Sequence, residues 1–361
     1  MKILSSIQFT FISIFLLLST KVFTITPFVF GYAGKDSIWS MSFGALIDFV
    51  ILFLVIIIMQ KNKGITFFEL LKKCFGTIIA KILLGLLFVF ILLKALFLYQ
   101  ETHSFFLQIL FDEFPLLLYV VPVLFITGYF AVKGIDTIAR SIEIFAIFVL
   151  IGVTICAATA INGANFNYLL PFFENGIGPS LDGLWAQMFY RGNPIILLCF
   201  MGKVEFKKYF NIKFMIANGI LLIMLLATAL LFYMVYGPSA RYVEFALADL
   251  PQYDPFVSDL GRFNWLSVVV CTIALFLTSS IFLYCMALIG RWIFGLKRSI
   301  IPVGISLTMV IILALMHQFS LPLMMVSVAN EWLWINASVL FLYVLLCLGL
   351  LIFRRKKWIK H

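Results

Sequence analysis

The sequence predicts an all-α integral membrane protein, and two observations lead to this prediction. Hydrophobic residues make up 64% of the 361 residues and charged residues only 12%, whereas a soluble domain carries about 25% charged residues. The apolar residues also form runs of about 20, the length that an α-helix needs to cross the hydrocarbon core of a bilayer. A transmembrane β-barrel would show shorter segments of alternating polarity, so we expect a bundle of membrane-spanning helices.

Ten apolar runs follow one another, and they predict ten transmembrane helices in a single domain that covers residues 1–361. The runs lie at about 7–33, 38–59, 78–102, 116–132, 141–161, 183–202, 212–236, 264–290, 300–318 and 332–353. The first run is longer than the apolar core of a signal peptide and has no clear small-residue cleavage site. We therefore expect it to be retained as the first span.

The charges of the connections between the runs predict the orientation in the membrane. Basic residues gather after even-numbered runs, at Lys61, Lys63, Lys72, Lys73, Lys203, Lys207, Lys208, Lys213, Arg291, Lys297, Arg298 and the stretch 354–360. Acidic residues gather after odd-numbered runs, at Asp112, Glu113, Glu174, Asp182, Glu244, Asp249, Asp254 and Asp259. The positive-inside rule then places both termini in the cytoplasm. The net charge of +10 is distributed in short patches between apolar runs, so a nucleic-acid partner is not expected and the lipid bilayer is.

Five of the charged residues within the apolar runs stand out: Lys21, Asp48, Lys94, Glu101 and Arg191. A charge inside a bilayer is costly and usually faces a cavity or a partner. Glu101 lies near the outer end of its run, where a position at the membrane interface would explain its charge. Lys94 lies deeper, about one helical turn beyond the depth from which a lysine side chain extends to the interface. Lys21 and Asp48 carry opposite charges in neighbouring runs, which predicts an ion pair between them.

Polar residues interrupt the first run near its middle. Ser19, Thr20 and Lys21 are consecutive, and Thr24 follows. The sixth run contains a corresponding interruption.

The sixth run is interrupted by Arg191, Gly192 and Asn193, followed by Pro194. Proline removes a backbone donor and clashes with the preceding helical turn. Five spans plus five spans would form two repeats of opposite topology, at about 1–161 and 183–353, in which the first and sixth runs correspond. Interrupted spans at corresponding positions are typical of the binding site of an inverted-repeat transporter.

The two interruptions together predict a ligand-binding site with Asp48 as its charge partner. Its expected ligand-binding residues are Ser19, Thr20, Lys21, Thr24, Arg191, Gly192 and Asn193. Taken singly, a proline kink or a buried lysine is as consistent with packing as with function, and it is the coincidence of the two that favours a site. The six cysteines form no metal-binding or redox motif, so no metal or other cofactor is expected. An enzyme is not expected either, because the sequence contains no nucleophile–base constellation and no phosphate loop.

Three stretches carry a resemblance to a known family: GYAGKDSIWSM at 31–41, KGIDTIARSIEIF at 133–145 and NYLLPFFENGIGPSLDG at 167–183. In order and spacing they resemble the B-subunit permeases of bacterial spore germinant receptors, within the amino acid–polyamine–organocation superfamily. The resemblance runs along essentially the whole chain. It implies a leucine-transporter-like fold of two inverted five-helix repeats, with helices 1 and 6 broken.

The resemblance also implies a function and partners. The chain would be the transmembrane subunit of a nutrient receptor in the spore inner membrane, where it would sense a small molecule such as an amino acid and help to trigger germination. Its partners would be an A-type subunit and a C-type lipoprotein subunit. The alternatives are a proton- or sodium-coupled amino acid permease and a channel-like or structural membrane component.

The chain departs from the pattern of that family at both interruptions. The family often has a Gly–Glu step where this chain has Gly192–Asn193, and a glycine-containing break where this chain has Ser19, Thr20 and Lys21. Two hypotheses follow for the Lys21 ammonium group. It takes the place of a coupling cation, or it meets the carboxylate of an amino-acid ligand.

Overall fold

The computed structural model describes residues 3–18, 21, 25–109, 115–174, 176–243, 245–252, 263–295, 300–318 and 330–357. Within these residues the regular structure is helical, apart from one isolated bridge between Leu4 and Val204. In the described ranges, seven helical segments are long and apolar enough to cross a membrane, and two shorter apolar helices accompany them. The predicted class, an all-α multi-pass membrane protein, is confirmed.

Helical structure is present in each of the ten predicted runs. The α-helices are α1 (Ser6–Leu18), α2 (Ile25–Ala33), α3 (Ser37–Lys61), α4 (Phe67–Phe75), α5 (Thr77–Ile109), α6 (Leu116–Lys133), α7 (Ile135–Ala158), α8 (Gly178–Ala186), α9 (Phe210–Tyr236), α10 (Ala246–Asp249), α12 (Phe263–Phe294), α13 (Ile300–Gln318) and α15 (Asn330–Lys357). Short 3-10 helices connect them: η1 (Gly34–Asp36), η2 (Ile161–Gly163), η3 (Phe166–Leu169), η4 (Gln187–Tyr190), η5 (Asn193–Phe200), η6 (Gly237–Tyr242) and η7 (Leu250–Gln252).

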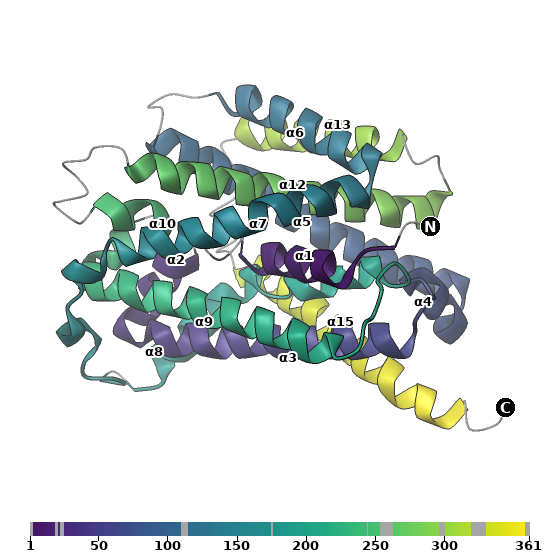
Figure 1. The fold of residues 1–361 in the computed structure, drawn as a ribbon, viewed down its shortest axis with the longest axis horizontal. Helices are drawn as coiled ribbons and strands as arrows, with labels where there is room; N and C mark the ends of the chain where they lie inside the picture. The colour runs from purple at the N-terminus through teal and green to yellow at the C-terminus, as the bar shows by residue number, and fades with distance from the viewer. Residues whose placement is uncertain are drawn as a thin grey trace.

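The two interrupted runs form the centre of the molecule. In α1, every residue from Ile12 to Leu18 is buried, and all eight residues of η5 are buried as well. α1 lies between α7 and α12 on one side and α9 on the other, and it also contacts η5 (Figure 1). Because Lys21 and the break at 191–193 are buried inside the bundle, their polar groups can only be satisfied by the protein or by an enclosed ligand.

The helices around this centre form two groups. α12 packs against α5, α6 and α7, and α13 packs on α6, as the upper part of Figure 1 shows. α3 packs against α8, α9 and η5 in the lower part, where α15 also contacts α3. The central segments α1 and η5 therefore lie between these two groups.

Basic residues gather at one end of the bundle, which we call the basic end. It contains α4, which begins with a capping box of Thr66 and Glu69 and exposes Lys72 and Lys73. The first described residues of the chain and the last turns of α15 lie at this same end, whereas α8 and α10 lie at the opposite end (Figure 1). The clustering agrees with the charge pattern from which the orientation was predicted.

The long connection after α9 packs onto the end opposite the basic end. Its residues Phe245, Leu247 and Leu250 are buried, and α10 contacts α7, α9 and α12. This part of the connection therefore covers the bundle rather than extending into solvent. Residues 253–262 lie outside the described part of the chain.

Candidate functional site

The backbone is interrupted in both central segments. α1 ends at Leu18 and α2 begins at Ile25, and between them the amide of Lys21 donates to the carbonyl of Leu18 at 3.0 Å. In the sixth run, Arg191 is extended after η4, and Gly192 has φ of +88° before η5 begins. Left-handed backbone of this kind favours glycine, so the sequence at 192 permits the break.

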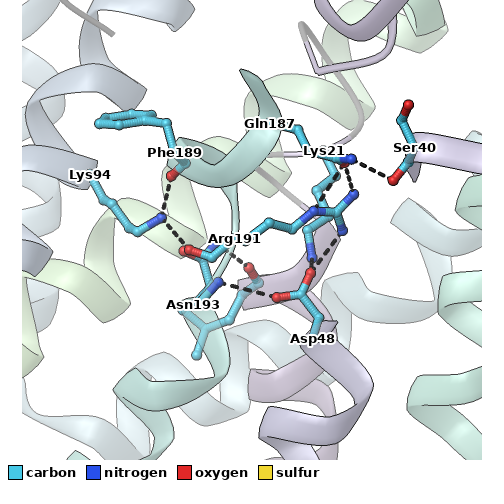
Figure 2. A network of polar contacts seen from close by, with 10 residues as sticks. Lys21, Ser40, Asp48, Lys94, Gln187, Phe189, Arg191 and Asn193 are labelled. Carbon is cyan, nitrogen blue, oxygen red and sulfur yellow. Dashed lines mark hydrogen bonds and ion pairs between the residues drawn. The ribbon is translucent and has the colours of Figure 1, made fainter. Parts of the chain in front are cut away.

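Asp48, in the middle of α3, joins the two interruptions. Its Oδ2 atom lies 2.5 Å from Nζ of Lys21 and 2.8 Å from Nη1 of Arg191. Its Oδ1 atom accepts a hydrogen bond of 3.2 Å from the backbone amide of Gly192. The carboxylate is fully buried, and Figure 2 shows it facing both cations. The ion pair that the sequence predicts between Lys21 and Asp48 is thus present, and Arg191 shares the same carboxylate.

One face of α3 holds Arg191 in place. Nε of Arg191 donates to Oε1 of Gln187 at 3.2 Å, Nη2 donates to the same oxygen, and Nε2 of Gln187 donates to the carbonyl of Ser40 at 2.5 Å. A Cβ atom on Gly44 would lie 2.5 Å from Nη2 of Arg191. Positions 40, 44 and 48 are spaced by four residues and so lie on one face of the helix. This face of α3 therefore contributes the carbonyl of Ser40 and the carboxylate of Asp48 to the network. The missing side chain of Gly44 leaves the room that the guanidinium group of Arg191 occupies.

Lys94 of α5 binds the end of η4. Its Nζ atom donates to the carbonyls of Phe189 at 2.6 Å and Arg191 at 2.8 Å, and it lies 4.8 Å from the centre of the Phe90 ring. Carbonyl groups at the end of a helical segment lack intrahelical partners and attract cations. Figure 2 shows Lys94 approaching the break from the side opposite Asp48.

Asn193 connects the sixth run directly to α1. Its Nδ2 atom donates to the carbonyl of Leu16, in the last turn of α1, at 2.8 Å. The hydroxyl of Thr278, in α12, donates to the neighbouring carbonyl of Phe15 at 3.3 Å. Side chains from two other segments therefore satisfy backbone carbonyls near the end of α1.

The charges of the network are unequal. Lys21, Lys94 and Arg191 are basic and Asp48 is acidic, and each of the four is 5% exposed or less. Buried charges are stable only when they are paired and hydrogen-bonded. Lys94 donates hydrogen bonds to backbone carbonyl groups, whereas Lys21 and Arg191 share the carboxylate of Asp48. The arrangement is therefore suited to receiving a further negative charge.

A small cavity touches the network. It has a volume of about 10 Å³, and its lining residues are Lys21, Ile25, Met41, Ala45, Arg191, Leu222, Leu225 and Leu226. This volume corresponds to about one water molecule. The site is therefore closed in this structure, and a ligand larger than water requires the surrounding helices to separate.

The structure brings together Lys21, Asp48, Arg191, Gly192 and Asn193. The other predicted site residues, Ser19, Thr20 and Thr24, lie outside the described residues.

Sequence reasoning assigned no role to Gln187 or Gly44, and it singled out Lys94 only as a charge within a span. The role of Lys94 was indicated in the sequence by one feature: it is a lysine in a neighbouring span at the depth of a break. Glu101, near the outer end of its run, is buried against other parts of the protein, with 1% of its surface exposed. Among the described residues, no group of three or more His, Cys, Asp and Glu side chains could hold a metal ion.

Comparison with known proteins places this geometry in a biological context. A family model described as spore germination protein, of the spore permease type, matches residues 3–321. No curated protein matches the chain.

Proposed function

The chain belongs to the spore permease family of spore germination proteins, and from this premise we propose that it is the sensing subunit of a nutrient germinant receptor. The coarser description, a multi-pass membrane protein connected with germination, follows from the family and the apolar helices. The proposal adds a ligand, a site and partners. It assigns no catalytic step to the chain, since the side chains of the central network are suited to binding charge rather than to making or breaking bonds.

One observation carries the proposal: a single buried carboxylate, Asp48, connects both interrupted spans. It bonds to Lys21 in the first break and to Arg191 and Gly192 in the second. A ligand that changes the contact of Asp48 with Lys21 also changes its contact with Arg191, because both cations bind the same Oδ2 atom. Such a network is suited to converting binding into a rearrangement of α1 and η5.

The ligand we propose is a small molecule with a carboxylate, such as an amino acid. The excess of cations favours an anionic group near Arg191 and Lys21, and a guanidinium group matches the two oxygens of a carboxylate. Ile25, Met41, Leu222 and Leu225 line the adjacent cavity and would contact an apolar side chain.

The proposed architecture is that of the leucine transporter: ten spans in two inverted repeats, with both termini in the cytoplasm. The paired breaks and the gathering of basic groups at one end support this architecture. The proposed partners are an A-type subunit and a C-type lipoprotein subunit, which would receive the rearrangement and pass it on.

The test uses spores of a strain in which this chain is the only member of its family, so that redundant receptors do not compensate. We expect spores with Arg191→Gln to lose the germination response to the nutrient that wild-type spores recognise, because the anion-binding guanidinium group is gone. Arg140→Gln is the matched control, since Arg140 is exposed on α7 and outside the network. Immunoblots of spore membranes establish that the two variants are present in equal amounts.

Two results would count against the receptor proposal. The first is a normal response of spores that lack the chain to every nutrient in a broad panel. The second is robust accumulation of an amino acid in proteoliposomes that contain this chain alone, which favours the alternative of a coupled permease.

A further inference from the structure

A second cavity lies at the basic end, and the central network does not explain it. Its volume is about 340 Å³, within the range of small-molecule sites. Its lining residues are Thr66, Ala131, Lys133, Ile135, Asp136, Lys203, Tyr284, Ala287, Leu288, Arg291 and Trp292. It shares no residue with the network around Asp48, so any ligand here occupies a separate site.

Three cations converge on this cavity from three different elements. Lys133 ends α6, Arg291 lies in the last turn of α12, and Lys203 lies in the connection between η5 and α9. Their convergence is a product of the tertiary structure, because the three residues are far apart in the sequence. Among the described residues that line the cavity, Asp136 supplies the one carboxylate. The lining therefore carries an excess of positive charge.

Lys203 is the deepest of the three cations. Only 7% of its surface is exposed, and its Nζ atom lies 2.9 Å from the hydroxyl of Tyr284 and 5.3 Å from the centre of that ring. An anionic ligand in the cavity would be attracted by Lys133, Lys203 and Arg291 together, and the attraction is stronger where a charge is buried away from water. A neutral ligand would gain no such attraction.

The chemistry of the lining narrows the class of anion. A guanidinium group and two ammonium groups are the usual protein ligands of phosphate. Basic pockets between transmembrane helices on the cytoplasmic side also bind the headgroups of anionic lipids. Ile135, Leu288 and Trp292 supply apolar wall, which suits the organic part of such a molecule.

We propose that this cavity is a binding site for a phosphate group, presented either by a soluble molecule or by the headgroup of an anionic lipid. Its occupant would bridge α6, α7, α12 and the connection at Lys203. That connection is also tied to the start of the chain, since the amide of Leu4 donates to the carbonyl of Lys203 at 2.7 Å. An occupant therefore stabilises the native packing of several elements, because a ligand that binds only the folded state raises its stability.

The experiment uses the purified full-length chain in nanodiscs and measures its thermal unfolding temperature. In one arm the nanodiscs contain only phosphatidylcholine. Inorganic phosphate is added in increasing concentration, and chloride at the same ionic strength is the reference. In the other arm the buffer contains no phosphate, and phosphatidylglycerol is added to the nanodiscs. Stabilisation in the first arm identifies a soluble source of the phosphate group, and stabilisation in the second arm alone identifies a lipid source; either supports the proposal if the variants below reduce it.

Arg291→Gln is the decisive variant, because Arg291 is exposed and its replacement leaves the fold intact. We expect it to weaken the apparent affinity by about tenfold, the effect of losing a charge-assisted hydrogen bond. Lys203→Gln should weaken it as well, but removing its buried bond to Tyr284 also affects folding. Lys73→Gln is the matched control. Lys73 is an exposed lysine of α4 at the same end and does not line the cavity, so the apparent affinity of this variant should stay within about twofold of wild type.

Three outcomes overturn the proposal. The first is the absence of stabilisation in both arms. The second is an equal loss of apparent affinity in Arg291→Gln and Lys73→Gln, and the third is no loss in Arg291→Gln, since phosphate also stabilises folded proteins through exclusion from their surface.

Discussion

Asp48 carries the largest energetic consequence of any single side chain in the central network. It is the shared partner of two buried cations, and it accepts a hydrogen bond from the backbone where the sixth run is broken. A buried ion pair contributes little relative to apolar packing, but removing one partner leaves an uncompensated charge. At the residue scale, the free energy of unfolding is therefore more sensitive to the loss of this anion than to the loss of either cation.

We predict that Asp48→Asn destabilises the protein strongly. Neutralising the carboxylate leaves Lys21 and Arg191 without a counter-charge, which costs about 3–5 kcal/mol in buried pairs. The measurement is thermal unfolding of the purified chain in detergent.

Adding Lys21→Met to Asp48→Asn should recover part of the loss, because one of the unpaired charges is then removed. Asp182→Asn is the control, because Asp182 is an exposed carboxylate of α8. Equal unfolding temperatures for Asp48→Asn and Asp182→Asn would contradict the role assigned to Asp48.

At the scale of elements, α3 and α5 hold the break in the sixth run from two sides. α3 contributes Ser40, Gly44 and Asp48 from one face. α5 contributes Lys94, whose ammonium group binds two carbonyls at the end of η4. The break is therefore a defined structure between two continuous helices, with its freed backbone groups satisfied by side chains.

Replacement of Lys94 tests this arrangement. We expect Lys94→Met to destabilise the protein, because two buried carbonyls lose their donor, and an unsatisfied buried polar group costs about 1–3 kcal/mol. The readout is the unfolding temperature together with the nutrient response of spores.

Lys81→Met is the matched control, an exposed lysine near the start of the same helix. If the two methionine variants behaved alike, Lys94 would have no part in holding the break.

At the scale of the whole molecule, the charge distribution predicts how the protein lies in the membrane. α4, the start of the chain and the last turns of α15 lie at one end, and the basic residues Lys72 and Lys73 are exposed there. The positive-inside rule assigns this end to the cytoplasm.

The exposed cysteine of α4 provides a direct test of orientation. Cys74 is exposed, whereas Cys156, Cys199, Cys271, Cys285 and Cys347 are buried. We predict that a membrane-impermeant maleimide labels inverted vesicles, in which the cytoplasmic side faces out, and leaves right-side-out vesicles unlabelled. Loss of the label in Cys74→Ser identifies the site of modification. Labelling of right-side-out vesicles only would reverse the assignment.

The sequence predicted more of the fold than of the site. The apolar runs located the helices because hydrophobicity and length are properties of contiguous segments. Pro194 and Gly192 indicated the break in the sixth run for the same reason, since each acts on its own stretch of backbone. The pairing of Lys21 with Asp48 could be predicted because the two residues lie in consecutive spans. The parts played by Lys94 and Gln187 could not, because they depend on which helices pack together at the depth of the break.

By itself, the sequence determined the membrane class, the helical architecture and the positions of the two interruptions, all of which follow from local composition. Only the tertiary structure decided that one carboxylate serves both interruptions and that Gly44 leaves room for Arg191. It alone also brought Lys133, Lys203 and Arg291 around one cavity. The physical reason is the same in each case: contacts between distant segments are set by how helices pack in three dimensions, and the spacing of residues along the chain does not encode that packing directly.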